Sequence, residues 1–552
     1  MAKETRPLPG MPYAASSASG ESALAMAVDH FNARRYAAAE EIALRLKQED
    51  SKDGRVLNLL GGIALERSDF AGAVTHLTAA SRVQGGNPYI WFNLGEAHRR
   101  GGAFAKSLPG YRKAVSIKSD FAEAYAMIGE AQRALNLPSE AEKAYRAALA
   151  INPHLTLALN GVGLAHLTAA RFAEAARAFS EAIKASPRDP ALHANLGQAL
   201  YQSGDTPGAL TAMLDAHALA PENEDFQRLL ARSFLHVREA PIHTHVRSAL
   251  MALFQSPSVN PRTLATAALS VLKREHDLDV FLQRIEANAV RADEIVADFE
   301  ADLNDLRGDP LFIALLSSAP APDIGFELAL RAMRKHALLN GSRSLAFLCA
   351  LARQCFLNEY IYYAGDDEKV ALGALRATIA AEGGSWEEWA LLSCYAPLYR
   401  EAVKPRDGAP EAFAPLLREQ IDEPLRELEI ADRIRALKPL SDEVSLVVQA
   451  QYEESPYPRW TRFDLSTPRP FADVVKAALP PLPEKMIPNI AAPRILIGGC
   501  GTGLETMRIL NSYQNASVLA LDLSRTSIAY GMRKLNEYGF ENVEHVHGDI
   551  LD

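Results

Sequence analysis

The sequence RILIGGCGTG, from Arg494 to Gly503, joins an apolar run to a turn rich in glycine. An apolar run bounded by glycine is typical of a buried strand, and glycines let the backbone turn sharply and approach a ligand closely. The next segment, Leu504 to Tyr513, has the apolar spacing of a helix. A strand, a glycine turn and a helix N-terminus together predict a site for a nucleotide-like ligand.

The elements that follow continue this pattern. A second apolar run, Ala516 to Leu523, contains Asp522, nineteen residues after Gly503. An acidic side chain at the tip of the second strand can accept hydrogen bonds from both hydroxyls of a ribose. We expect a helix at Ser524 to Tyr538 with Ser524 as its N-cap, and a third strand at Val543 to Val546. These elements predict half of a doubly wound sheet.

The glycine spacing separates two classes of nucleotide site. A dinucleotide fingerprint, G-x-G-x-x-G, fails in both registers, because its third glycine falls on Leu504 or on Thr506. The glycine spacing therefore argues against a nicotinamide-dependent enzyme. The sequence GCGTG, from Gly499 to Gly503, instead resembles motif I of class I methyltransferases that use S-adenosylmethionine.

This resemblance implies a set of cofactor-binding residues. The glycine turn lines the methionine and ribose portion of S-adenosylmethionine, and the later residues hold the ribose hydroxyls and the adenine. One departure is Ile497, where such enzymes often carry an acidic residue two places before the first glycine. The implied set is Gly499, Cys500, Gly501, Thr502, Gly503, Asp522 for the ribose hydroxyls, Leu523 against the adenine, and Asp549 with Ile550 at the adenine amino group.

The first part of the chain carries an internal repeat of 34 residues. Small residues at fixed points let two helices cross closely, and a proline ends the second helix of each pair. The pattern resembles the tetratricopeptide repeat, which implies a solenoid whose concave surface binds a peptide or a protein partner, although a scaffold or dimerisation surface is the alternative. The repeat is carried by Gly61, Gly95, Gly129, Gly163 and Gly197, by Ala80, Ala114, Ala148, Ala182 and Ala216, and by Pro153, Pro187 and Pro221.

We therefore predict a mainly α protein with a repeat solenoid, an irregular helical middle domain and the first half of an α/β, Rossmann-like methyltransferase domain. The helical middle includes predicted helices at Leu345 to Tyr363 and at Trp386 to Val403. It either bridges the repeats to the methyltransferase part or covers the substrate entrance. The predicted domains are a flexible tail at 1–20, repeats with a cap at 21–237, a helical domain at 238–445, an aromatic and proline-rich linker at 446–493, and the half domain at 494–552.

A stiff aromatic segment precedes the glycine motif. Val444 to Trp460 reads VSLVVQAQYEESPYPRW, and its prolines restrict the backbone of their neighbours. A similar segment precedes motif I in methyltransferases that are fused to tetratricopeptide repeats. It can fold over the cofactor or the acceptor, or it can serve as a rigid spacer.

Composition excludes several functions. The 552 residues are 48% apolar and 23% charged, with a net charge of −10, which disfavours a broad electrostatic grip on nucleic acid. The four cysteines show neither metal-ligand nor disulfide spacing, so we expect no metal and a reducing cytoplasm. We find no signal-peptide core and no apolar run that would span a membrane.

The last segment is short for its fold. Only 59 residues run from Arg494 to the end, whereas a self-sufficient domain has on the order of 100 residues or more. We therefore expect a longer natural protein, and an unpaired apolar edge on the first strand. No general base is identified, so the catalytic residues are left unassigned. The leading hypothesis is a methyltransferase with a protein-binding array and an unknown acceptor, and the alternative is a non-catalytic repeat scaffold.

Overall fold

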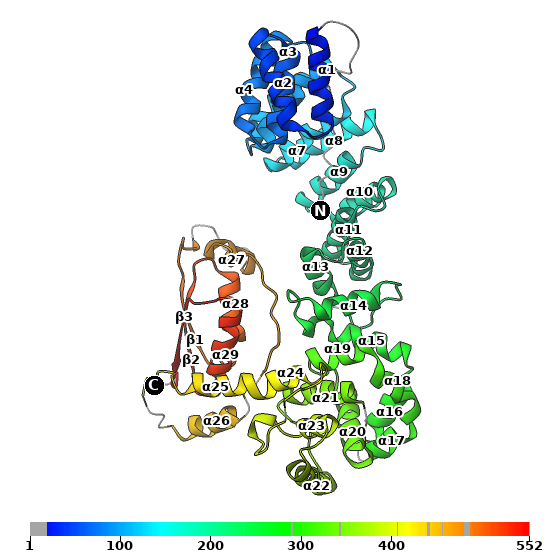
Figure 1. Cartoon of the computed structure of the whole chain (residues 1–552), viewed down its shortest axis with the longest axis vertical. Coiled ribbons are helices and arrows are strands. Elements are labelled where there is room, and N and C mark those ends of the chain that lie inside the picture. The colour runs from blue at the N-terminus through cyan, green and yellow to red at the C-terminus, as the bar shows by residue number, and fades with distance from the viewer. Residues whose placement is uncertain are drawn as a thin grey trace. The chain divides into compact units, whose positions relative to one another are not determined.

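The structure is a computed structural model that describes residues 19–235, 237–288, 291–341, 344–405, 407–438, 442–454, 456, 458–479 and 486–550. The chain divides into two compact units, Met1–Leu219 and Ala220–Asp552 (Figure 1). Most of the predicted flexible tail, together with Tyr457 of the aromatic segment and much of its proline-rich continuation, lies outside the described residues. The domain boundaries stay predictions.

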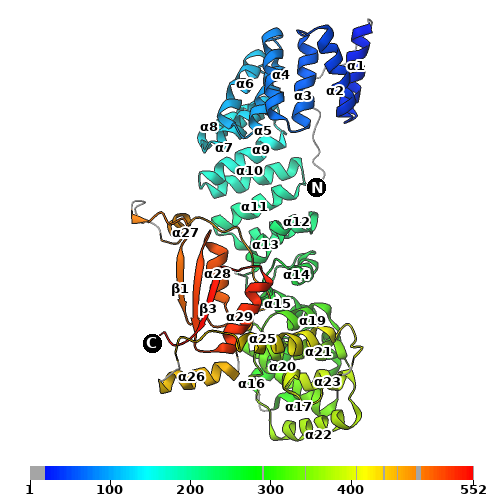
Figure 2. The same ribbon diagram turned by 60° about the vertical axis from the view of Figure 1, so that its left-hand side comes forward.

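The first unit is a stack of helices, each packed against the next along the chain (Figure 2). This confirms the predicted solenoid. Its helices are α1 (Ser19–Asn32), α2 (Tyr36–Glu49), α3 (Gly54–Glu66), α4 (Phe70–Val83), α5 (Pro88–Arg100), α6 (Phe104–Ile117), α7 (Ala122–Ala134), α8 (Pro138–Ile151), α9 (Thr156–Thr168), α10 (Phe172–Ala185), α11 (Pro190–Ser203) and α12 (Thr206–Leu219).

The repeated small residues mark the helix crossings. A Cβ added to Gly95 would lie 2.6 Å from the ring of Tyr111, and one added to Gly129 would lie 2.6 Å from the ring of Tyr145. Each glycine therefore leaves room for an aromatic side chain of the following helix. The repeated alanines, including Ala148, are buried between helices. The 34-residue period thus arises from the packing of one helix pair on the next.

The second unit begins with irregularly packed helices. They are α13 (Glu224–Phe234), α14 (Val246–Gln255), a 3₁₀ turn η1 (Pro261–Leu264), α15 (Ala265–Glu275), α16 (Asp279–Ala287), α17 (Ala292–Asp298), α18 (Glu300–Gly308), α19 (Pro310–Ser318), α20 (Ile324–Asn340), α21 (Leu345–Leu357), α22 (Asp366–Glu382), α23 (Trp386–Ser393) and a second 3₁₀ turn, η3 (Leu398–Arg400).

Two of these helices are shorter than the sequence predicts. α21 ends at Leu357 rather than Tyr363, because Glu359 and Tyr360 both adopt left-handed backbone, with φ of 55° each. α23 ends at Ser393, and the chain continues only as a short 3₁₀ turn instead of a helix to Val403. The spacing of apolar residues alone does not predict where these two helices end.

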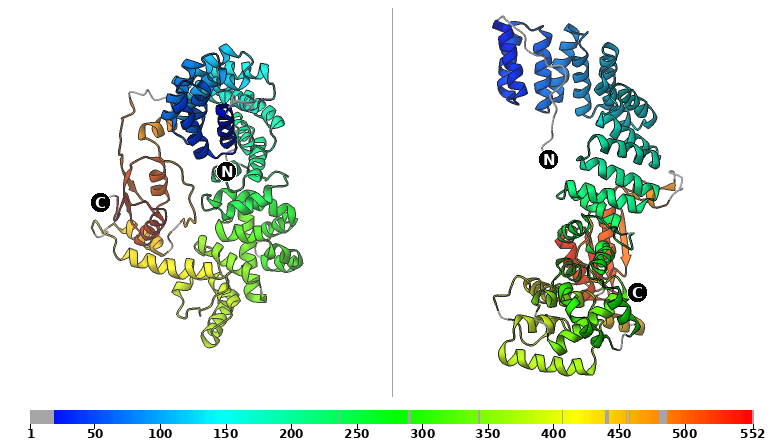
Figure 3. Two further views of the ribbon diagram at one scale, coloured as in Figure 1. Left: turned by 45° about the horizontal axis from the view of Figure 1, so that its top comes forward. Right: turned by 90° about the vertical axis from the view of Figure 1, so that its right-hand side faces the viewer.

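A long helical stretch then leads towards the sheet. It consists of α24 (Ala414–Leu417), a π-helical turn η4 (Arg418–Asp422) and α25 (Glu423–Ala431), which run without interruption (Figure 3, left). α26 (Glu443–Glu454) and α27 (Phe471–Ala478) follow. α26 runs across residues 445 and 446, where the sequence analysis placed a domain boundary.

The sheet has three parallel strands in the order β1-β2-β3 among the described residues. They are β1 (Arg494–Gly498), β2 (Ser517–Asp522) and β3 (Val543–His547). α28 (Leu504–Ser512) and α29 (Arg525–Glu537) connect them, on the same side of the sheet in Figures 1 and 2. In the described part of the chain β1 pairs with β2 alone, and Leu496 at this edge is 63% exposed.

One hydrophobic core unites the sheet with upstream segments. Trp460 and Phe463 pack in the same cluster as Met507 of α28 and Ile528 of α29. Ala431, at the end of α25, belongs to it as well. The segment before the glycine motif is therefore part of the fold that presents the site.

Candidate cofactor site

A cavity of ≈ 500 Å³ opens where the strands end. This is where ligands bind in open parallel sheets. Its walls come from the turn after β1, the end of β2, the residues after β3 and the segment upstream of the sheet. Eight of the nine residues predicted to bind the cofactor lie in its wall, namely Gly499, Cys500, Gly501, Thr502, Asp522, Leu523, Asp549 and Ile550.

The ninth, Gly503, shapes the turn instead of lining the cavity. Gly499, Gly501 and Gly503 have φ of 76°, 49° and 79°, a region that L side chains rarely adopt. A Cβ on Gly503 would lie 3.0 Å from the Cα of Gly531 in α29. Gly503 also precedes α28, so it starts that helix and lets the turn rest directly on α29.

Asp522 holds the glycine turn. One carboxylate oxygen accepts the backbone N–H of Gly501 at 2.7 Å, and the other accepts the N–H of Ser524 at 2.9 Å. Each carboxylate oxygen can accept a second hydrogen bond. Asp522 can therefore keep the turn in place and still accept from the hydroxyls of a ribose.

Asp549 lies buried after β3 and is met by a helix from upstream. Ser445 of α26 donates its hydroxyl to Asp549 at 2.5 Å. Val448 and Tyr452 of the same helix line the cavity. α26 therefore forms one wall of the site.

The upstream helix is fixed to the start of α29. The Glu453 carboxylate accepts the backbone N–H groups of Arg525 and Thr526 at 2.7 and 3.1 Å. A carboxylate is favourable there, because the first N–H groups of a helix lack partners within the helix. The segment is thus anchored at the cavity, which agrees with a fold over the site rather than a detached spacer.

The proline-rich part of the segment contacts the glycine turn itself. Thr502 donates its hydroxyl to the carbonyl of Pro458 at 2.7 Å, and its own carbonyl accepts the indole N–H of Trp460 at 2.9 Å. Tyr530 of α29 accepts the backbone N–H of Trp460 at 3.0 Å. Pro458 lies in the cavity wall, whereas Trp460 is buried behind it.

Two charged residues in the wall were missed from the sequence. Glu505 and Arg508 belong to α28 and form an ion pair at 3.3 Å. Both are exposed side chains at the start of a helix, which gives no local signal of a site. Cys500, in contrast, is buried, and burial raises the pKa of its thiol to about 12, so that it is neutral rather than a nucleophile.

Other kinds of site are not found in the described part of the chain. No group of three or more His, Cys, Asp or Glu side chains there is arranged to hold a metal ion. Among those same residues, none of the helices has the length and apolar character to cross a membrane. The cavity offers the Asp522 carboxylate, which can accept further hydrogen bonds, and an apolar rim, while the N–H groups of Gly499, Cys500, Gly501 and Gly503 are used within the protein. These walls suit a ligand with hydroxyl groups and an apolar part.

Comparison with known proteins identifies both ends of the chain. A tetratricopeptide-repeat model matches residues 59–120 and 161–236, and a second such model matches residues 122–155. A model described as a methyltransferase domain matches residues 495–552. No curated protein sequence matches the chain.

Several solved structures resemble part of the chain. A tetratricopeptide repeat protein from Parabacteroides merdae is 18% identical, with 43% of this chain and 91% of that chain covered and a TM-score of 0.35. PilW, a type IV pilus biogenesis factor, is 15% identical, with 38% and 98% covered and a TM-score of 0.36. MamA from Desulfovibrio magneticus is 17% identical, with 31% and 96% covered and a TM-score of 0.29.

The family models agree with the observed elements. The repeat models fall on the helical stack of the first unit and extend to α13, and the methyltransferase model begins within β1 and covers the sheet. The chain is a fusion of tetratricopeptide repeats with a segment of the methyltransferase-domain family.

Proposed function

We propose that the protein is a methyltransferase that uses S-adenosylmethionine and recruits a protein through its repeats. The observation that carries this proposal is the meeting of eight motif residues around one cavity at the ends of the strands, in the segment that matches the methyltransferase domain. A cavity of ≈ 500 Å³ is within the usual range for small ligands and cofactors. The methyl acceptor is unassigned.

The residues fit the cofactor by their chemistry. Asp522 accepts from the ribose hydroxyls, Leu523 packs on the adenine, and Asp549 accepts from the adenine amino group with Ile550 beside it. The space beside the glycine turn, which has no side chains at Gly499 and Gly501, receives the remaining portion of the ligand. These roles rest on the donor and acceptor types present in the wall and on the family resemblance.

The amino acid end of the cofactor needs both a negative and a positive partner. Ile497 occupies the place of the acidic residue that related enzymes often carry. Glu505 and Arg508, within the first five residues of α28, provide one negative and one positive side chain in the cavity wall. We assign Glu505 to the α-ammonium group and Arg508 to the α-carboxylate, because charged hydrogen bonds are the strong ones at such a site.

Catalysis then depends on alignment. Bound S-adenosylmethionine supplies an electrophilic methyl group, and a good nucleophile in line with it needs little further help. In this chain, Asp522 fixes the turn, and Val448, Tyr452 and Pro458 form one side of the cavity. No described residue is assigned as a general base.

Calorimetry with S-adenosylhomocysteine on the whole chain tests the cofactor assignment. We expect saturable binding, and weaker binding of S-inosylhomocysteine, which lacks the adenine amino group that Asp549 would accept. Absence of heat with both ligands would reject the cofactor proposal and leave the repeats as the functional part. Equal binding of both ligands would reject the role of Asp549 alone.

The repeat array supports a second element of the proposal. Tetratricopeptide repeats are interaction modules, so we propose a peptide or protein as partner, without nucleic acid or membrane. The four cysteines are free and buried, which is compatible with a reducing cytoplasm. Cross-linking of the whole chain in a cell extract, followed by mass spectrometry, should place partner peptides on α1–α12. Cross-links confined to residues 220–552 would contradict this role.

A further inference from the structure

A second cavity lies beyond the Pro458–Trp460 segment. Pro458 contributes to the candidate cofactor site, while Arg459 to Arg462 contribute to a separate cavity of ≈ 620 Å³. Its other walls come from α14, α19, α21, the π-helical turn, α25 and α29. The volume suits a small organic ligand.

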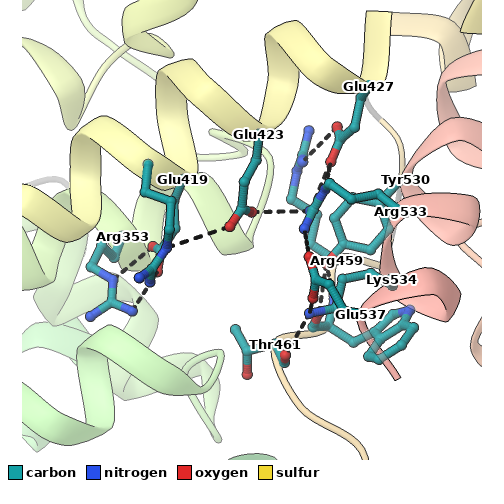
Figure 4. A network of polar contacts seen from close by, with 12 residues as sticks. Arg353, Glu419, Glu423, Glu427, Arg459, Thr461, Tyr530, Arg533, Lys534 and Glu537 are labelled. Atoms are coloured by element: carbon teal, nitrogen blue, oxygen red, sulfur yellow. Dashed lines mark hydrogen bonds and ion pairs between the residues drawn. The ribbon is translucent and has the colours of Figure 1, made fainter. Parts of the chain in front are cut away.

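Carboxylates four residues apart face this region from one helix. Glu419, Glu423 and Glu427 follow the same side of the stretch from η4 to α25, as Figure 4 shows. The two carboxylate oxygens of Glu419 accept hydrogen bonds from Nε and Nη2 of Arg353, at 2.8 and 2.7 Å. Glu423 and Glu427 bind Arg533 of α29 at 3.0 and 2.8 Å.

The other cations are paired too, with one exception. Lys534 contacts Glu537 at 2.7 Å, and Arg459 forms an ion pair with Glu359. Arg418, at the outer rim, contacts Glu419 at 3.3 Å. The carboxylates of the network are therefore all engaged by neighbouring arginine or lysine side chains.

The exception is Arg462. Its guanidinium donates to the backbone carbonyls of Ser256 and Phe254, at 2.5 and 2.6 Å, and forms no ion pair with any residue in the described ranges. Burial lowers its pKa, the nearby Tyr538 hydroxyl opposes this shift, and the charge of Arg353 acts in the same direction as burial. No carboxylate is among the groups that shift the pKa of this cation.

Aromatic rings complete the walls. Phe254, Phe356 and Trp460 line the cavity. The guanidinium of Arg459 lies 4.2 Å from the centre of the Phe356 ring, so the apolar wall stands next to the charged one. A ligand that matches these walls has one negative charge and an apolar body.

We propose that this cavity is a binding site for a small organic carboxylate whose anionic group meets Arg462 and whose apolar part lies against Phe254, Phe356 and Trp460. A carboxylate carries one charge at neutral pH, which matches the single unpaired cation. A phosphate monoester carries about 1.5 to 2 charges and would leave an excess of negative charge among Glu419, Glu423 and Glu537.

The test uses phenylacetate as the probe and phenylacetamide as its uncharged counterpart, titrated into the whole chain and followed by ligand-detected NMR. We expect saturable binding of phenylacetate at millimolar concentration, and binding of the amide weaker by about tenfold or more. No saturable binding, or equal binding of the amide, would overturn the proposal. Tighter binding of phenyl phosphate than of phenylacetate would overturn the choice of a carboxylate.

Variants locate the binding. Arg462→Gln should weaken phenylacetate binding by about tenfold or more, whereas Arg177→Gln, at an exposed position of α10, should leave it unchanged. Arg462 also donates hydrogen bonds to two backbone carbonyls, so its replacement can destabilise the fold. A second variant therefore tests the site independently. Ser318→Phe places a ring in the cavity without removing a charge, and it should abolish binding. Unchanged binding in a folded Ser318→Phe protein would place the ligand elsewhere and refute the site.

Discussion

Replacing Asp522 by asparagine is a sharp perturbation of the cofactor site. The carboxylate accepts two backbone N–H groups, from Gly501 at 2.7 Å and from Ser524 at 2.9 Å. Asparagine retains one oxygen acceptor and turns the other position into an NH₂ donor. Whichever way the amide is oriented, one backbone N–H then faces a donor.

The magnitude follows from the lost bonds. A hydrogen bond to a charged acceptor contributes about 1.5–3 kcal/mol, so Asp522→Asn should lower the free energy of unfolding of the second unit by about 2 kcal/mol. In the proposed complex, the ribose hydroxyls would lose the same charged acceptor. At about 1.4 kcal/mol per factor of ten, affinity for S-adenosylhomocysteine should fall by about 10- to 100-fold. The two losses are separate quantities and can be measured separately.

Urea unfolding followed by far-UV circular dichroism gives the stability, and calorimetry gives the affinity. Asp473→Asn is the matched control, because Asp473 is an exposed carboxylate of α27 outside the cavity wall, and both quantities should remain at the wild-type value. A folded Asp522→Asn protein with wild-type affinity would refute the ribose role. Wild-type stability would refute the view that this carboxylate holds the turn.

Three further predictions concern the charged groups of the second unit. Arg533→Met removes the nearer partner of Glu427, 7% exposed, and leaves it only the longer contact to Arg459 at 3.8 Å, so it should cost about 3 kcal/mol in urea unfolding; adding Glu427→Leu should recover part of that loss, and strict additivity of the two changes would contradict the pairing. Burial lowers the pKa of His545 from 6.5 to about 4, so the unfolded chain binds this proton more readily and stability should fall from pH 7 towards pH 4, by about 2 kcal/mol at pH 5. His545→Gln should remove that part of the acid sensitivity, and an unchanged pH profile of the urea midpoint would refute it. Glu505→Gln should weaken binding of S-adenosylhomocysteine by about tenfold but spare methylthioadenosine, which lacks the amino acid group; equal losses for both ligands would refute the assigned contact.

Sequence reasoning located the parts of the site that depend on local backbone conformation. The turn from Gly499 to Gly503 has its own signature, since its backbone needs residues without a Cβ. Asp522 was found because it is the acidic residue at the end of the second apolar run. Ser524 was recognisable as an N-cap and accepts the N–H of Ser527 at 3.0 Å. These features are fixed by neighbours in the chain.

The rest of the site depends on contacts between distant segments. Ser445 and Asp549 are 104 residues apart, and nothing near either residue indicates their hydrogen bond. Val448 and Tyr452 lie in the segment that the sequence analysis described as stiff and aromatic, and only the packing of α26 brings them to the cavity. The left-handed backbone at Glu359 was equally hidden, because glutamate is not a residue that commonly marks such a position.

The shared core between the sheet and the upstream chain limits how the protein can be dissected. Sequence similarity marks residues 495–552 as the methyltransferase segment, yet Ala431, Trp460 and Phe463 are buried in the same cluster as Met507. A fragment cut at Arg494 would lose these side chains and expose the surfaces that they cover. The segment that the methyltransferase model matches is therefore smaller than the part of the chain that folds as one unit. A fragment that is expected to fold has to begin before α25.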